Sequence, residues 1–369
     1  ERPNINISWL ADHPATLVLK DHGENLLPEA ALLTHGNKKL EDSAKDYQNN
    51  LVRWVMNMRK AWSKNAEIFA KIAENECFDL VIGDETYDLT IGIVENPKLK
   101  KFPFAMIYDF IGLDSVTWNP IDKLVAYMTN RLWVKILTKD PPVADHFVFL
   151  GEFEDVQDRK FGFMLPNRRW IAKKYLDFVG YVLSFDPRHY EDKAKVRRNL
   201  GYGKEPLIVC SIGGTAGGKP LLDLCLKAYP IIKKELKDLR MVLVCGPRLS
   251  PTNIEAPDGV EVKGYVPELY RHLAASDLCI VTGGGTITLE LTALQRPFLY
   301  FPLEKHFEQE IEVVRRCERH NAGVKMKYSK TKPESLAKHA LLNIGKRVDF
   351  ASIPIDGAQK AAKLISNLL

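Results

Sequence analysis

The sequence lacks the features that would assign it to a class at once. No apolar run reaches the roughly 18 residues that suggest a membrane-spanning helix. The six cysteines, at positions 77, 210, 225, 245, 279 and 317, form no C-x-x-C pair. This argues against a disulfide framework or a zinc site and favours reduced thiols in a cytosolic protein. A net charge of +5 over 369 residues is too small to indicate nucleic acid as a partner.

The common phosphate-binding motifs are absent as well. The glycine-rich stretch 213–218 lacks the Lys-Ser/Thr ending of a P-loop. A second cluster, Gly283–Gly285, lies late in the chain and lacks the G-x-G-x-x-G spacing of a dinucleotide-binding fold. No D-x-D triplet occurs. The sequence therefore predicts neither a bound metal nor a cofactor.

What the chain does contain is a repeated alternation of short apolar runs and amphipathic segments. Such alternation predicts an α/β protein with two Rossmann-like, doubly wound parallel sheets. We expect an N-terminal domain over 1–177, a C-terminal domain over 178–355, and a final helix over 356–369 that packs back on the first domain. A strand with a glycine-rich loop does not open the chain, so we expect the first strand, loop and helix to be missing from this numbering. A family with a shorter first domain is the alternative.

The stretch Asp277–Asn321 organises the second half. A buried strand, Leu278–Val281, runs into Gly283–Gly285, and apolar residues at helical spacing follow from Thr286 to Leu294. A glycine turn that leads into a helix N-terminus binds anions well, because free N–H groups and the helix dipole both point outward. A second strand, 297–301, precedes another polar helix start.

This stretch resembles the nucleotide-sugar site of GT-B glycosyltransferases, in particular the UDP-sugar-dependent plant-type enzymes and the peptidoglycan N-acetylglucosaminyltransferase. The shared pattern is a glycine turn, a Glu on the next helix, a Pro on each side of a strand, and an acid–Gln pair. In this chain the pattern consists of Gly283–Thr286, Glu290, Pro297, Pro302 and Glu308–Gln309. Plant-type members have His where this chain has Thr282, so their His–phosphate contact is not expected here.

The resemblance implies a role for each element. The glycine turn, with the second loop across the cleft, would hold the diphosphate, Glu290 the ribose hydroxyls, and the acid–Gln pair the sugar hydroxyls. A ring at the position of Tyr265 could pack on uracil. The implied donor-binding residues are Gly213, Gly214, Thr215, Tyr265, Val266, Gly283, Gly284, Gly285, Thr286, Glu290, His306, Glu308 and Gln309. Each taken singly also fits an ordinary loop, cap or core position.

Acidic residues follow two predicted strands of the first half. Asp84 and Glu85 come after the strand 78–83, and Asp109 follows the strand 104–108. Ligands bind at the carboxyl ends of parallel strands, so we expect an acceptor pocket there, with Glu85 and Asp109 as candidate catalytic bases. Helix capping for Asp84 and a turn for Asp109 are equally good explanations, and the base could also belong to the missing N-terminal loop.

A basic stretch lies at the predicted junction of the two domains. Six basic residues and no acid occur there together with aromatic side chains: Arg159, Lys160, Arg168, Arg169, Lys173 and Lys174. Such a mixture can bind an anionic membrane, although a solvated connector between domains is slightly favoured. We expect a cytoplasmic protein, with contact to the inner face of a membrane as the alternative.

Together these features predict a two-domain GT-B enzyme with its active site between the domains. It would move a hexose or N-acetylhexosamine from a UDP-sugar to an acceptor hydroxyl, with inversion and without a metal. The acceptor is open: a lipid, a glycan or a small molecule. A UDP-N-acetylglucosamine 2-epimerase and a non-catalytic sugar-nucleotide-binding subunit are the alternatives, and a membrane-surface or nucleic-acid-binding protein is the weakest.

Overall fold

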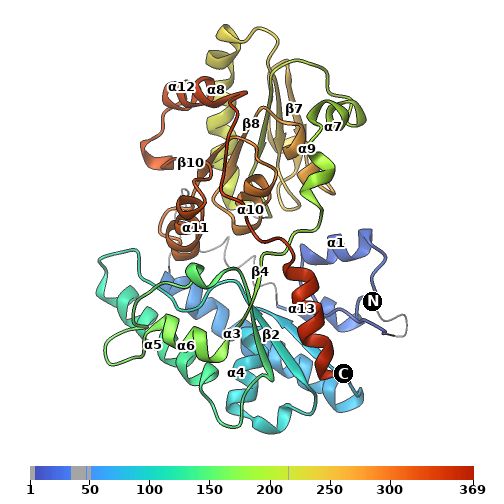
Figure 1. The fold of residues 1–369 in the computed structure, drawn as a ribbon, viewed down its shortest axis with the longest axis vertical. Helices are drawn as coiled ribbons and strands as arrows, with labels where there is room; N and C mark the ends of the chain where they lie inside the picture. The colour runs from blue at the N-terminus through green and yellow to red at the C-terminus, as the bar shows by residue number, and fades with distance from the viewer. Residues whose placement is uncertain (1–4, 35–46, 48–50, 215) are drawn as a thin grey trace. The chain divides into compact units, whose positions relative to one another are not determined.

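A computed structural model describes residues 5–34, 47, 51–214 and 216–369 (Figure 1). The chain forms two compact units. The first comprises Glu1–Ser43, Leu51–Val182 and Pro354–Leu369, and the second comprises Ala44–Asn50 and Leu183–Ile353. In the described residues, none of the helices combines the length and the apolar character needed to span a bilayer.

The first unit is built on a four-stranded parallel sheet in the order β1-β2-β3-β4. Its strands are β1 (Val81–Asp84), β2 (Phe104–Tyr108), β3 (His146–Leu150) and β4 (Asp177–Gly180). Nearly all of β2 is buried, as its apolar sequence FAMIY requires of an inner strand that is covered on both faces. The sequence pattern assigned the strand from Phe178 to the second half, but β4 pairs with β3 and completes the first sheet.

α-Helices also belong to this unit. They are α1 (Ala15–Asp21), α3 (Leu51–Asn75), α4 (Tyr87–Glu95), α5 (Pro120–Leu137), α6 (Arg168–Tyr175) and α13 (Gly357–Ile365). The side chain of Asn119 caps α5 and Pro120 occupies its first turn, both of which favour a helix start. The C-terminal helix α13 lies beside β4 (Figure 1), where Ala361 and Ile365 pack against Val148 and Val179.

The second unit contains a six-stranded parallel sheet in the order β10-β9-β8-β5-β6-β7. Its strands are β5 (Leu207–Ser211), β6 (Arg240–Val244), β7 (Val260–Lys263), β8 (Leu278–Thr282), β9 (Phe298–Phe301) and β10 (Val324–Lys325). From β5 the chain continues through β6 to β7 on one side of the sheet. From β8 it continues through β9 to β10 on the other side. The boundary between β5 and β8 is therefore a topological switch point, the place where open α/β sheets bind ligands.

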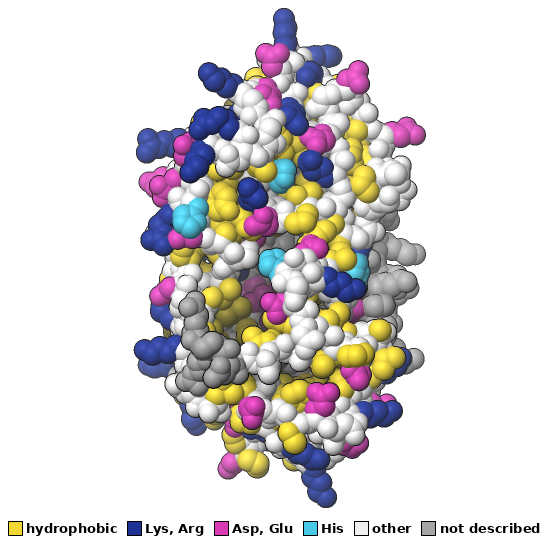
Figure 2. All heavy atoms as spheres, turned by 90° about the vertical axis from the view of Figure 1, so that its right-hand side faces the viewer, with side chains coloured by type: hydrophobic (Ala, Val, Ile, Leu, Met, Phe, Trp, Pro, Cys, Tyr) yellow, Lys and Arg dark blue, Asp and Glu magenta, His cyan; other side chains and the backbone are white. Residues whose placement is uncertain are grey.

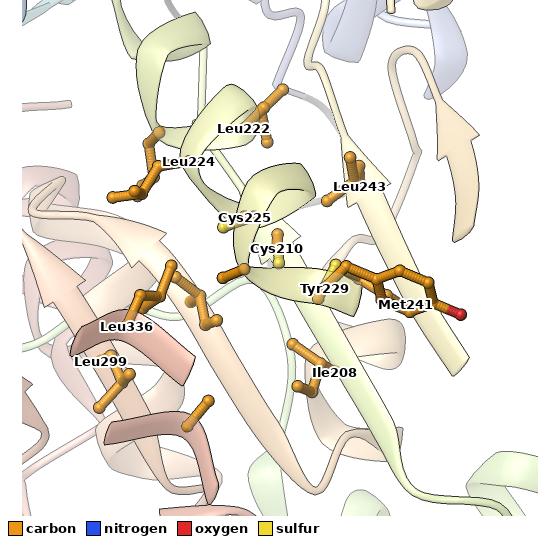
Figure 3. Packing of buried hydrophobic residues seen from close by; sticks show 14 of the residues in the cluster. Ile208, Cys210, Leu222, Leu224, Cys225, Tyr229, Met241, Leu243, Leu299 and Leu336 are labelled. Carbon is orange, nitrogen blue, oxygen red and sulfur yellow. The ribbon is translucent and has the colours of Figure 1, made fainter. Parts of the chain in front are cut away.

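The two faces of β5 belong to two different cores. Ile208 and Cys210 point to one face and pack with α8 (Lys219–Glu235) and α12 (Pro333–Asn343), as Figure 3 shows for Cys225 and Leu336. Val209 points to the opposite face, as the two-residue period of a strand dictates. That face is covered by α9 (Tyr270–Ala275), α10 (Gly285–Ala293) and α11 (Val314–Arg319), and α7 (Lys193–Asn199) packs beside α9.

Charged side chains on the surface do not segregate by sign on the face drawn in Figure 2. Lys and Arg are interspersed there with Asp and Glu, and hydrophobic side chains come to the surface between them. This mixture agrees with the small net charge of +5.

Candidate functional site

The two predicted glycine loops start side by side at the switch point. Ser211, the last residue of β5, pairs with Val281 of β8, so the chain leaves both strands at the same level. Thr282 lies between the loops. Its Oγ1 is 3.9 Å from the position that a Cβ on Gly213 would take, and its Cγ2 is 3.2 Å from the corresponding position on Gly218. The structure thus brings the two loops together, as predicted, while Thr215 lies outside the described residues.

The glycines in these loops are required by close backbone approaches. A Cβ on Gly283 would lie 2.6 Å from Cα of Pro302, so β8 can leave the sheet beside the end of β9 only without a side chain. The turn after β6 approaches even more closely, because a Cβ on Gly246 would lie 2.1 Å from the carbonyl oxygen of Gly213. Three turns therefore form one tightly packed edge.

The N-terminus of α10 presents its amide groups at this edge. Gly284 is the N-cap residue, and no side chain caps the helix. The first N–H groups of a helix have no partner within the helix, and the helix dipole adds partial positive charge there. Gly283, Gly284, Gly285 and Thr286 thus form a glycine turn that leads into a helix N-terminus, as the sequence predicted, and anion binding there remains a prediction.

Arg316 is a cation at this site that no local sequence pattern predicted. It lies on α11, and its Nη2 donates hydrogen bonds to the carbonyl oxygen of Gly285 and to Oγ1 of Thr288. Glu308 reaches the same place, because its Oε1 is 3.8 Å from the position of a Cβ on Gly285. Only tertiary packing brings residue 316 to the glycine turn, which explains why the residues around it gave no signal.

Glu290 has the environment of a binding carboxylate. It is half-buried on α10, and its carboxylate makes no hydrogen bond or ion pair with another described residue. Burial raises the pKa of Glu290 from about 4.5 to about 7. Glu290 lies five positions after Gly285, which corresponds to about 7.5 Å of helix rise. A ligand that places an anionic group at the helix N-terminus could therefore offer hydroxyl groups to this carboxylate.

The loop after β9 is held in shape by its own side chains. Oε1 of Gln309 accepts a hydrogen bond of 2.8 Å from the backbone N–H of Leu303, and Oε2 of Glu310 accepts one of 3.1 Å from that of Lys305. His306 is only 6% exposed, and burial lowers its pKa to about 4. The predicted sugar-binding residues thus help to build the loop. Because the side-chain oxygen of Gln309 is used within the loop, its side-chain NH2 group is the part available to a ligand.

Glu308 begins a π-helical turn, Glu308–Val313, that continues into α11. Such turns are rare and frequently occur at functional sites. Tyr47, from the N-terminal half of the sequence, braces this loop: its hydroxyl donates a hydrogen bond of 2.7 Å to the carbonyl oxygen of Phe301, and its own carbonyl oxygen accepts one from the N–H of Glu304. The ring of Tyr47 stacks on Tyr328. Nothing in the sequence around position 47 indicated this contact.

The predicted base-binding pair, Tyr265 and Val266, follows β7 at the edge of the sheet. Both side chains are half-buried, and Val266 packs against the core beneath α9 and α10. β7 is separated from β5 by β6 alone, so the strand that this pair follows lies about 10 Å from β5. Packing against the core accounts for the partial burial of Val266. Contact with a base remains a prediction for Tyr265.

The acidic residues of the first unit gather at the ends of β1 and β2. These strands are neighbours, and Asp84 pairs with Ile107, two residues before Asp109. Partial desolvation raises the pKa of Asp84, and the charge of Asp109 raises it further. Oε1 of Glu85 accepts a hydrogen bond of 3.1 Å from Tyr87. The structure thus brings Asp84, Glu85 and Asp109 to one sheet edge, as the strand pattern predicted.

One member of the basic stretch cannot contact a membrane. Arg168 is fully buried, and its guanidinium group binds Asp114 through Nη1 at 2.8 Å and Nη2 at 3.0 Å. A buried cation needs such a partner, and here the pair fixes the start of α6. Arg169 donates a hydrogen bond to the carbonyl oxygen of Val156. The prediction that Arg168 takes part in membrane contact is therefore wrong.

No group of three or more His, Cys, Asp or Glu side chains suited to hold a metal occurs within the described ranges. A reaction without a metal nevertheless remains an expectation of the family resemblance. In such a reaction the leaving diphosphate would be stabilised by helix N-termini and cationic side chains.

Residues 208–364 match the model of the glycosyltransferase family 28 C-terminal domain. The match contains both glycine loops, Glu290 and the loop after β9. An uncharacterized glycosyltransferase of Methanosarcina mazei is 31% identical over 108 residues, which are 29% of this chain and 27% of that protein. The chain thus spans about a quarter of that relative's length.

A longer match is the UDP-N-acetylglucosamine–N-acetylmuramyl-(pentapeptide) pyrophosphoryl-undecaprenol N-acetylglucosamine transferase of Clostridioides difficile. It is 27% identical over 322 residues, which are 83% of this chain and 68% of that protein. The matches in sequence thus extend beyond the second unit.

Solved structures share the fold. The glycotransferase of kitacinnamycin superposes with a TM-score of 0.54 at 15% identity, covering 98% of this chain and 86% of that one. A candidate UDP-N-acetylglucosamine 2-epimerase of Listeria monocytogenes superposes with a TM-score of 0.50 at 13% identity, covering 84% and 78%. The predicted resemblance to GT-B glycosyltransferases and the predicted fold class are confirmed, and the fold alone is shared with epimerases.

Proposed function

We propose that this chain, whose residues 208–364 match the model of the glycosyltransferase family 28 C-terminal domain, transfers a hexose or N-acetylhexosamine from a UDP-sugar to an acceptor hydroxyl. The observation that carries the proposal is the arrangement at the switch point. An uncapped helix N-terminus between two glycine loops lies about 7.5 Å along α10 from Glu290, a carboxylate without a described partner. A diphosphate joined to a ribose fits both features.

In this proposal the second unit binds the donor and stabilises the leaving group. Negative charge develops on the diphosphate as the bond to the sugar breaks, and the amides of α10, with Arg316 behind them, would face that charge without needing to reorganise. A base of the first unit, Asp109 or Glu85, would take the proton of the acceptor hydroxyl. Direct displacement by that hydroxyl would invert the anomeric centre.

We expect UDP to bind and purine nucleoside diphosphates to bind much more weakly. The reason is the combination of Tyr265, Glu290 and both glycine loops, which resembles UDP-sugar enzymes. Isothermal titration calorimetry with UDP, ADP and GDP at equal ionic strength measures the difference. Equal or tighter binding of ADP or GDP would rule out a UDP-sugar donor.

Transfer and epimerisation are distinguished by their products. Incubation with UDP-N-acetylglucosamine alone should leave the donor largely intact, whereas an added acceptor should release UDP in proportion to the glycoside formed. Chromatography of the nucleotide fraction follows both reactions. Conversion to UDP-N-acetylmannosamine without any acceptor would identify an epimerase instead.

Gln309 allows the sugar contact to be separated from the structure of the loop. Gln309→Glu keeps an oxygen that can accept from Leu303 N–H but removes the amide donor, whereas Gln309→Ala removes both. If the amide NH2 group donates to a sugar hydroxyl, Gln309→Glu should lower UDP-sugar affinity about tenfold, because that hydroxyl then loses its hydrogen-bond donor. The affinity for UDP, which has no such sugar hydroxyl, should stay nearly unchanged. Calorimetry with both ligands measures this. Equal losses for the two ligands would mean that the residue only shapes the loop.

A further inference from the structure

Tyr47 comes from the first half of the sequence but is part of the second unit. The segment Ala44–Asn50 is grouped with that unit, whereas Glu1–Ser43 and Leu51–Val182 are grouped with the first. The side chain of Tyr47 is only 2% exposed and belongs to the same hydrophobic core as Cys225 of α8. The second unit therefore includes more than the C-terminal half of the chain.

Tyr47 contacts the loop after β9 at two points. Its hydroxyl donates a hydrogen bond of 2.7 Å to the carbonyl oxygen of Phe301, the last residue of β9. Its own carbonyl oxygen accepts a hydrogen bond of 3.1 Å from the N–H of Glu304. The side chain and the main chain of one residue thus hold the backbone on both sides of Pro302 and Leu303.

Leu303, between these two points, carries the hydrogen bond that orients Gln309. The N–H of Leu303 donates to Oε1 of Gln309 at 2.8 Å, which leaves the NH2 group of that side chain for a ligand. The direction of the Leu303 N–H depends on the backbone on each side of it, and that is the part of the loop that Tyr47 holds. Tyr47 can therefore act on the orientation of the Gln309 amide through the backbone of Leu303.

The carbonyl oxygen of Phe301 also anchors the glycine turn before α10. The N–H of Gly283 donates to it at 2.7 Å, so this oxygen accepts two hydrogen bonds, one from Gly283 and one from Tyr47. A carbonyl oxygen has two lone pairs, and both are used here. Removal of the Tyr47 hydroxyl would leave the bond from Gly283 in place. The glycine turn would then keep its anchor, while the loop after β9 would lose one.

Further contacts fix Tyr47 in one position. Its ring stacks on Tyr328, with centroids 4.6 Å apart and an angle of 25° between the rings. The next residue, Ser329, donates its N–H to Oε1 of Glu304 at 2.8 Å, which ties the same parts together a second time. The backbone of Tyr47 has φ +62°, a left-handed conformation that persists in a residue other than glycine only where the surrounding structure imposes it.

We propose, on the basis of the proposed UDP-sugar site, that Tyr47 is a positioning residue for the sugar of the donor. It would hold the backbone from Phe301 to Glu304 so that the NH2 group of Gln309 faces a sugar hydroxyl. UDP has no such hydroxyl, so Tyr47 should matter for a UDP-sugar and not for UDP. A residue that only fills the core would not distinguish between the two ligands.

Tyr47→Phe in the full chain tests this role, because it removes the hydroxyl and keeps the buried ring. Calorimetry should show that the affinity for UDP-N-acetylglucosamine falls about fivefold, as expected for the loss of one neutral hydrogen bond, and that the affinity for UDP changes by less than about twofold. Urea unfolding verifies that the variant is folded.

The matched control is Tyr229→Phe. Tyr229 is 3% exposed, lies in the same core and donates its hydroxyl to the carbonyl oxygen of Asp258 at 3.1 Å. Asp258 precedes β7, so this hydrogen bond lies at the amino ends of the parallel strands, the edge opposite the glycine loops. Tyr229→Phe removes a buried hydroxyl of the same kind and should leave the affinities for both ligands unchanged.

A double variant tests the route through Gln309. In the Gln309→Ala background, Tyr47→Phe should lower the affinity for UDP-N-acetylglucosamine by less than a further factor of about two, since the amide that it positions is gone. Equal losses for both ligands in Tyr47→Phe, no loss for either, or full additivity with Gln309→Ala would overturn the positioning role and leave the proposed function intact. A parent that binds neither UDP nor UDP-N-acetylglucosamine would overturn the proposed function and the positioning role together.

Discussion

Gly246→Ala should abolish UDP binding and lower the free energy of unfolding by roughly 2–5 kcal/mol. Two effects add at this position. The backbone of Gly246 has φ +73°, which an L-residue adopts only at a cost of about 1–2 kcal/mol. In addition, the new Cβ would lie 2.1 Å from the carbonyl oxygen of Gly213, a backbone atom that cannot swing aside as a side chain would. The loop after β5 must therefore move, and with it one wall of the proposed diphosphate site.

Gly201 provides a control for the backbone cost alone. Its φ is +72°, almost the same as that of Gly246, but a Cβ there would meet no atom within 4 Å. Gly201→Ala should therefore lose only about 1–2 kcal/mol and bind UDP as the parent does. Urea unfolding and calorimetry on the two variants give the comparison. Similar losses of stability and affinity at both positions would contradict the role assigned to the collision with Gly213.

The features that the sequence predicted correctly are those with a local signal. Apolar runs that end in glycine or in acidic residues marked the buried strands, and the residues after those runs met at sheet edges because parallel strands point the same way. The two glycine loops at the switch point and the acids after β1 and β2 follow from this rule. The order of the strands did not, because it depends on which strands pair in space.

The features that the sequence missed or placed wrongly depend on distant partners. In the sequence Arg168 cannot be distinguished from the surface cations around it. Asp114, far from it in the chain, provides the carboxylate that makes its burial possible. Arg316 reaches the carbonyl of Gly285 only because α11 packs beside α10.

Glu290→Gln is expected to separate the effect of this carboxylate on ligand binding from its effect on the free energy of unfolding. In the folded chain the pKa of Glu290 is about 7, well above the value of about 4.5 expected in the unfolded chain. The folded state therefore keeps a proton that the unfolded state releases, and the stability of the parent should fall as the pH rises from about 4.5 through 7. Glutamine has no such proton, so the variant should be the more stable protein at pH 8, by about 1 kcal/mol or more.

Binding should show the opposite pH dependence. In the proposed function two ribose hydroxyls donate to the ionised carboxylate, so only the deprotonated form of Glu290 would be competent, and its fraction rises from about one tenth at pH 6 to about nine tenths at pH 8. The association constant for UDP-N-acetylglucosamine, whose diphosphate does not titrate in this range, should increase about tenfold over that interval. His306, with its pKa near 4, stays neutral throughout.

The Gln variant should bind at least tenfold more weakly than the parent at pH 8, because charge-assisted hydrogen bonds to the hydroxyls are lost, and its affinity should be nearly independent of pH. At pH 6 the two proteins should differ little, since most of the parent is then protonated at the same position. Calorimetry at three pH values, with urea unfolding in parallel, measures both properties on one pair of proteins. If the affinities of parent and variant run parallel across the pH range, the ribose hydroxyls bind elsewhere, and Glu290 is a half-buried helix residue whose charge merely weakens the fold.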